Sequence, residues 1–227
     1  MKDLIERVLS YIPTYLQTFA SVLTRPKTFA ATQRGDEANR FRDGLVFLGI
    51  SIVVQILLAW NRLPAEREAY EAAGTQALIV AVSMALGMAQ LLVAWRLVGG
   101  RAPAINFAII YCYFVGVWNV TLSVLLVLGL GAFKFLDQPI YDAYIASLHA
   151  HAPEPPGLEA SAGFRSLVLV FVAGVLLVSV WMFLAWGAWR ELNGLSRWRS
   201  FVAAIIVLVT AIPTVAITLF LAFGLQP

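Results

Sequence analysis

Apolar residues gather in five long runs that alternate with short polar connectors. Each run is close to the ~20 apolar residues that a helix needs to cross a ~30 Å hydrocarbon core. A helix also satisfies its own backbone hydrogen bonds, which lipid cannot do. The pattern therefore predicts an all-α polytopic membrane protein, with five transmembrane helices in a membrane domain over residues 44–227. The spans cover about residues 44–62, 75–98, 104–130, 164–189 and 201–225.

Residues 1–43 have a different pattern and are expected to form an N-terminal segment and linker. Their apolar residues recur at three- and four-residue steps, the stripe of an amphipathic helix. The stripe is too polar to span a bilayer, so we predict an interfacial helix. Packing of the stripe on the protein's own membrane domain is an equal alternative, and Pro13 is expected to bend or interrupt the helix. The stripe consists of Leu4, Ile5, Val8, Leu9, Ile12, Leu16, Phe19 and Leu23.

The connectors predict how neighbouring elements are joined. Mixed charges over residues 32–43 predict a solvated loop or short helix. Residues 99–103 are so few that the second and third spans must form an antiparallel hairpin. In the longest connector, 132–163, apolar residues at helical spacing predict a short interfacial helix, about Pro139–Ala150, with Asp137 as its N-cap.

The tryptophans fall into two groups by their position in the runs. Trp60, Trp95, Trp189 and Trp198 stand near span ends and fit an aromatic belt at the membrane interface. Trp118 and Trp181 lie deeper, and we expect them to pack between helices.

Composition agrees with a membrane protein. Of 227 residues, 60% are hydrophobic and only 13% are charged, against about a quarter charged in soluble domains. The net charge of +3 does not indicate nucleic acid, because the basic residues flank the spans. Cys112, the one cysteine, lies in an apolar run and allows no intrachain disulfide. Charged residues interrupt the first apolar segment, so no cleavable signal peptide is expected.

The basic residues are distributed unevenly over the two sides of the predicted membrane. Twelve of the 16 lysines and arginines precede the first span or stand between spans two and three or four and five. The positive-inside rule then places the N-terminus in the cytoplasm and, after five spans, the C-terminus on the periplasmic or extracellular side. The four on the other side are Arg62, Arg67, Lys134 and Arg165.

Neutral amides are the most polar groups inside the predicted spans. No ionisable residue falls in the middle of a span, which argues against a proton-coupled pump. Gln55, Gln90, Asn106 and Asn119 are candidates for a neutral polar path between helices, and Asn119 is the deepest of them. The simpler interpretation is that such groups hydrogen-bond one helix to another.

Motifs for catalysis or cofactor binding are missing from the sequence. We find no nucleophile motif, phosphate-binding glycine loop or paired carboxylates within spans, so we predict no enzyme and no cofactor. His149 and His151 could supply two metal ligands from an extended segment. No third ligand stands at a diagnostic spacing, so a metal site is not predicted.

The segment Thr24–Ala31, TRPKTFAA, separates the amphipathic pattern from the spanning one. Followed by a charged segment and a first span, it resembles the Yip family of small multi-span membrane proteins, in which Arg25, Pro26, Thr28 and Phe29 would form the leading element. The turns before spans three and five, Gly99–Arg101 and Gly194–Ser196, add to the resemblance, which covers about residues 20–225.

The resemblance implies a non-enzymatic protein that binds partners in the membrane. Eukaryotic Yip proteins bind Rab-type GTPases and reticulon-like partners and act in trafficking and membrane curvature. The acidic-aromatic motif that usually precedes their first span is missing here, and the Ala, Arg and Leu usage resembles a bacterial relative in the inner membrane. Two functions follow as hypotheses: a membrane scaffold bound to lipid and to a protein partner or second copy, or a channel, permease or transporter subunit. The scaffold would dock through Arg25, Pro26, Lys27 and Phe29.

Overall fold

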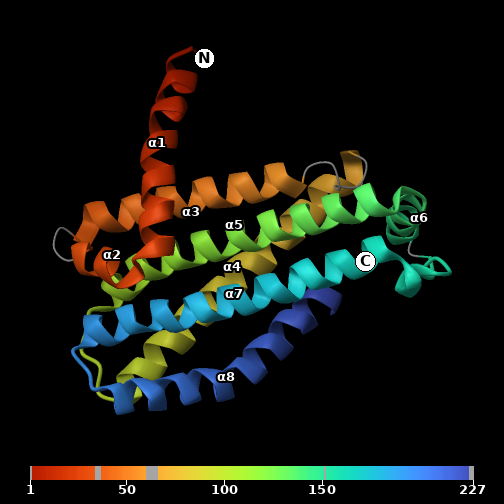
Figure 1. Cartoon of the computed structure of the whole chain (residues 1–227). Helices are drawn as coiled ribbons and strands as arrows, with labels where there is room; N and C mark the ends of the chain where they lie inside the picture. The colour runs from red at the N-terminus through yellow and green to blue at the C-terminus, as the bar shows by residue number, and fades with distance from the viewer. Residues whose placement is uncertain (1, 34–36, 60–65, 151, 225–227) are drawn as a thin grey trace. The chain divides into compact units, whose positions relative to one another are not determined.

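The computed structural model describes residues 2–33, 37–59, 66–150 and 152–224. Every regular element in this part of the chain is a helix, which confirms the all-α expectation. In chain order the elements are α1 Lys2–Thr24, α2 Pro26–Thr32, α3 Glu37–Ala59, α4 Glu66–Leu97, α5 Ala104–Leu136, α6 Gln138–His149, the 3-10 turn η2 Leu158–Ala160, α7 Ala162–Asn193 and α8 Arg197–Gly224 (Figure 1).

Three helical stretches among the described residues are long and apolar enough to cross a membrane. They are Ala38–Leu58 in α3, Ala104–Leu136 in α5 and Ala162–Asn193 in α7. Their surfaces carry large apolar side chains: on α7, Leu169 is 72% and Phe183 is 81% exposed. Faces of this kind fit contact with lipid rather than water. The helices therefore suggest a chain integrated in a membrane.

The folded helices differ from the predicted elements at several boundaries. The segment expected as a loop or short helix is divided, because α2 ends at Thr32 and α3 already begins at Glu37. Pro13 lies inside α1 and does not end it. Helix α5 continues past Gly129 to Leu136. A Cβ at Gly129 would come within 2.8 Å of a Leu167 methyl carbon, so this glycine serves close helix packing.

The described chain forms two compact units. Unit 1 comprises Met1–Leu48, Ala65–Phe114 and Leu184–Pro227, and unit 2 comprises Gly49–Pro64 and Val115–Phe183. Helices α3, α5 and α7 contribute residues to both units.

In unit 1, α4 packs extensively on α8. Trp95 of α4 is fully buried and stacks on Trp186 of α7 with 5.2 Å between ring centroids. The Trp186 Nε1–H donates to the backbone oxygen of Ser200 at 3.1 Å. These contacts tie α4 and the start of α8 to the end of α7.

The aromatic-belt prediction is wrong for two of its four tryptophans. Trp95 is 0% exposed and Trp189 is 4% exposed, and Trp189 stacks on Phe107 with 5.2 Å between ring centroids. Both rings are packing residues of unit 1. Trp198 is 71% exposed, as a belt residue would be, and Trp60 lies outside the described residues.

Unit 2 has its core around Phe133 of α5. The fully buried ring contacts Tyr141 and Tyr144 of α6 and Phe164 of α7, with centroids 5.4 to 5.9 Å apart. This confirms the helix predicted at about Pro139–Ala150, although its tyrosines pack partly on the core. Asp137 is the N-cap residue of α6, but its side chain accepts a hydrogen bond from Ser161 Oγ at 2.7 Å instead of capping the helix.

Candidate functional site: the TRPKTFAA segment

The TRPKTFAA segment forms a sharp junction between two helices. Helix α1 ends at Thr24, and Arg25 leaves the helical conformation with φ −139° and ψ 58°. Pro26 then takes the first position of α2, where its missing N–H costs nothing and its fixed φ suits a new helix. A residue before proline is disfavoured in the helical region, so Pro26 accounts for the end of α1 at Thr24.

Phe29 docks the segment onto unit 1. Its ring meets the Tyr113 ring of α5 edge to face, with 4.7 Å between centroids. Tyr113 in turn contacts Phe47 of α3 at 5.0 Å, and Phe47 stacks on Tyr15 of α1 at 4.9 Å. These four rings, the aromatic row, connect α2, α5, α3 and α1 in one continuous series.

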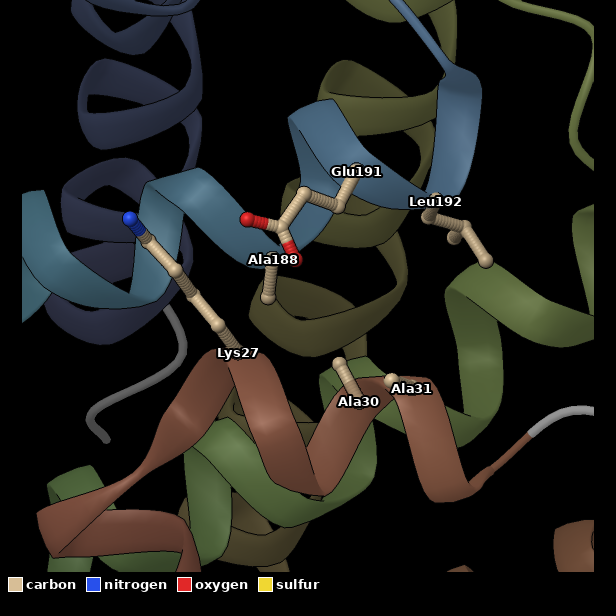
Figure 2. A pocket seen from close by; sticks show the side chains of 6 residues that line it. All are labelled: Lys27, Ala30, Ala31, Ala188, Glu191 and Leu192. Carbon is tan, nitrogen blue, oxygen red and sulfur yellow. The ribbon is translucent and has the colours of Figure 1, made fainter.

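Lys27 and the small residues of α2 meet the end of α7. Ala30 is buried, and the stem of Lys27 lies against Gly187, where a Cβ would overlap its Cε atom. Figure 2 shows the side chains of Lys27 and Glu191 reaching along a small cavity from α2 and α7. The cavity has a volume of about 10 Å³, close to the space of a single water molecule. It is too small to hold a solute or a cofactor.

Three of the four predicted docking residues are therefore used within the chain. Pro26 is buried, and Lys27 and Phe29 are half-buried against α7 and α5. Arg25 is exposed. The segment therefore packs on surfaces of α5 and α7 that belong to the same unit 1.

Helix α1 has a packed side and an uncovered side. Tyr15 and Val22 are buried, at 8% and 0% exposure, on the side that packs on the rest of unit 1. Ile12 and Leu16, on the neighbouring side of the helix, are 45% and 58% exposed. In Figure 1 α1 crosses the start of α3 and does not run alongside it. One side of α1 therefore packs on the protein, while Ile12 and Leu16 of the predicted stripe remain uncovered.

The four amides proposed as a polar path fall into separate units. In unit 1, Gln90 Nε2 donates to Thr210 Oγ1 of α8 at 2.9 Å, the helix-to-helix bond of the simpler interpretation. Asn106 Oδ1 is buried and has no hydrogen-bond partner in the described chain. Gln55 and Asn119 belong to unit 2, and both are half-buried.

No site for a metal ion is formed by the described part of the chain, in which no three His, Cys, Asp or Glu side chains cluster. The side chain of His149 and all of His151 lie outside the described residues.

The comparisons with known proteins give no family assignment. No family model, curated protein or solved structure matches the chain. The candidate role of the TRPKTFAA segment therefore rests on its own contacts.

Sequence reasoning did not identify the residues that receive the segment. Phe47 and Tyr113 stand in apolar runs like many of the 14 phenylalanines and seven tyrosines. Gly187 is one of 16 glycines, and no motif surrounds it. Only the pairing of α2 with α5 and α7 distinguishes these three positions.

Proposed function

We propose that this protein is a non-enzymatic integral membrane scaffold of the Yip type, with five spans, whose N-terminal helix contacts the membrane surface and a partner. The observation that carries the proposal is the uncovered stripe of α1, Ile12 and Leu16, beside the packed stripe of Tyr15 and Val22. One face of such a helix holds it on the protein. The adjoining apolar face can insert into the membrane at the level of the lipid headgroups.

Helix lengths support the five-span arrangement. Helices α4 and α8 contain 32 and 28 residues, which correspond to about 48 and 42 Å at 1.5 Å per residue. Both exceed the ~30 Å hydrocarbon core, so together with α3, α5 and α7 they would make five spans. The Yip relationship rests on the TRPKTFAA segment and the order of the turns. The excess of basic residues on one side supports a cytoplasmic N-terminus, and the Ala, Arg and Leu usage supports a bacterial inner membrane.

The uncovered stripe is tested by Ile12→Gln combined with Leu16→Gln. Glutamine keeps the helix propensity of leucine, so α1 should remain folded. The matched control, Thr14→Gln with Ser21→Gln, places two glutamines on the side of α1 opposite Ile12 and Leu16. In the first experiment the full chain is reconstituted in liposomes, and vesicle diameters are measured by electron cryomicroscopy. In the second experiment the chain is purified in mild detergent, and the proteins that co-purify are identified and quantified. We expect the stripe variant alone to lose membrane deformation and several-fold of its partner recovery, at an unchanged melting temperature. Equal behaviour of the three proteins would contradict the proposal.

Orientation is tested by labelling introduced cysteines. In a Cys112→Ala background, Thr14→Cys and Glu154→Cys each add one exposed thiol. A membrane-impermeant maleimide applied to spheroplasts should label position 154 and spare position 14. Labelling of both, or of position 14 alone, would overturn the proposed topology.

A neutral solute path is the second candidate, favoured by the buried and unpartnered Asn106 Oδ1. Such an oxygen can accept a hydrogen bond from a passing hydroxyl group. Stopped-flow light scattering would measure glycerol entry into liposomes that contain the wild-type protein or Asn106→Leu. Entry no faster than into empty liposomes would exclude a glycerol path.

A further inference from the structure

Helices α4 and α7 end in the same kind of turn. Gly99 has φ +93°, and the N–H that follows it donates to Trp95 O at 2.8 Å. Gly194 has φ +61°, and the next N–H donates to Arg190 O at 3.2 Å. A left-handed glycine with this long backbone bond is the Schellman cap. Each cap stops its helix abruptly and starts a short loop.

The loop after α4 is fastened to the end of α7 and lies against the start of α8. Asn193 Oδ1 accepts the N–H of Ala102 at 3.3 Å, and Arg96 donates to the backbone oxygens of Gly100 and Ala102 at 3.2 and 2.8 Å. The Arg199 guanidinium lies over Gly99, with Nη1 3.3 Å from where a Cβ would stand. The loop after α4 is thereby held beside the start of α8, within unit 1.

This junction concentrates positive charge. Arg101, Arg197 and Arg199, here called the arginine patch, are all exposed. None of the three forms an ion pair within the described chain. Residues 81–114 and 184–213 of unit 1 contain five arginines against one acid, Glu191, which lies 3.9 Å from Arg190. No acidic side chain of the described chain forms an ion pair with the patch.

Large apolar side chains border the patch. Trp198 stands between Arg197 and Arg199 in sequence, is 71% exposed and lies 5.7 Å from the Phe201 ring, which is 55% exposed. Leu97, just before Gly99, is 69% exposed. An exposed tryptophan beside arginines suits the interface between headgroups and acyl chains. A purely soluble anion would leave these apolar surfaces in water.

We propose that the arginine patch binds the headgroups of anionic phospholipids, with Trp198 and Phe201 against the glycerol and upper acyl region. Arginine forms paired hydrogen bonds with phosphate oxygens, and basic groups at the surface attract the anionic leaflet. The site depends on membrane insertion of the chain but not on partner binding by α1, so it stands if the scaffold role fails.

The test measures lipid retention by the full chain. Protein in neutral detergent is titrated with phosphatidylglycerol or with phosphatidylcholine of the same acyl chains, and bound lipid is counted by native mass spectrometry. We expect phosphatidylglycerol to be retained preferentially. Each arginine replaced should weaken its binding about 5-fold, since one basic residue near an anionic surface contributes ~1 kcal/mol. The test variant is Arg101→Gln with Arg197→Gln and Arg199→Gln.

A charge-matched control separates the site from net charge. Arg42→Gln with Lys134→Gln and Arg165→Gln also removes three exposed positive charges, and it should keep the preference. The proposal is overturned if the control loses as much preference as the patch variant, or if inorganic phosphate or polyglutamate displaces the lipid at equal charge concentration. It also fails if the wild-type protein shows no preference, a result that does not depend on whether either variant folds.

Discussion

The ring of Phe29 meets the ring of Tyr113 edge to face, with 4.7 Å between their centroids. Phe29 belongs to α2 and Tyr113 to α5, so the pair joins the TRPKTFAA segment to a helix far along the chain. Aromatic pairs of this geometry contribute about 0.5–1.5 kcal/mol beyond their buried area. The segment is consequently a packed part of unit 1 and not a plain linker.

Replacing Phe29 with alanine should release α2 from α5. We expect a loss of about 1–2 kcal/mol in unfolding free energy, less than for a fully buried phenylalanine because Phe29 is half-buried. Trypsin cleavage after Lys27 should accelerate in parallel. Thr28→Ala, at an exposed position of the same helix, is the control. A double-mutant cycle with Tyr113→Ala that gave additive effects would show that the two rings do not interact.

Replacing Gln90 with leucine should weaken the packing of α4 on α8. The Gln90 amide donates to Thr210 Oγ1, and bonds of this kind between membrane helices contribute about 0.6 kcal/mol, with a maximum near 1.7. Unfolding titrations in mixed detergent micelles would measure the loss. Ser179→Ala, which removes a hydroxyl bonded within its own helix, should have a smaller effect. Equal losses for both would mean that the amide contributes nothing specific to the helix pair.

The effect of replacing Gly87 on the melting temperature should depend on the residue at position 111. A Cβ at Gly87 of α4 would collide with the Tyr111 hydroxyl of α5. Alanine is favoured over glycine in a helix by about 1 kcal/mol, whereas overpacking costs about 1–3 kcal/mol. Gly87→Ala should therefore lower the melting temperature of the wild-type chain and raise that of a Tyr111→Phe chain. The same direction of change in both backgrounds would refute the contact.

Ser161 should stabilise the first turn of α7, in unit 2, as its N-cap. Its Oγ accepts the Phe164 N–H at 3.2 Å and donates to Asp137 at 2.7 Å. Loss of an N-cap costs ~1 kcal/mol, and the Asp137 bond adds to this. Ser161→Ala should therefore increase amide hydrogen exchange at Phe164 and Arg165 about 5-fold or more. Ser166→Ala, whose hydroxyl bonds only within α7, should leave both amides protected, and equal exchange in the two variants would count against the cap.

Much of the fold could be predicted because its signals are local. Long apolar runs, the stop at Pro26 and the helix after Asp137 each depend on residues adjacent in sequence, whose backbone preferences act without tertiary contacts. Boundaries that depend on packing were predicted less well. The third span was expected to end near residue 130, but α5 runs to Leu136 and Gly129 allows close contact with Leu167. Trp95 was expected at the membrane interface but is fully buried against Trp186.

By itself the sequence determined the helical class, the apolar runs and the junction at Thr24–Ala31, since hydrophobic period and proline geometry are properties of neighbouring residues. Only the tertiary structure decided what the junction contacts. The aromatic row and the Lys27 stem over Gly187 join residues from separate helices, and the arginine patch joins a loop to the start of α8. Such pairings depend on which helix faces meet, and periodicity along one helix carries no information about its neighbour. For that reason the TRPKTFAA segment was recognisable from the sequence, while its binding surface was not.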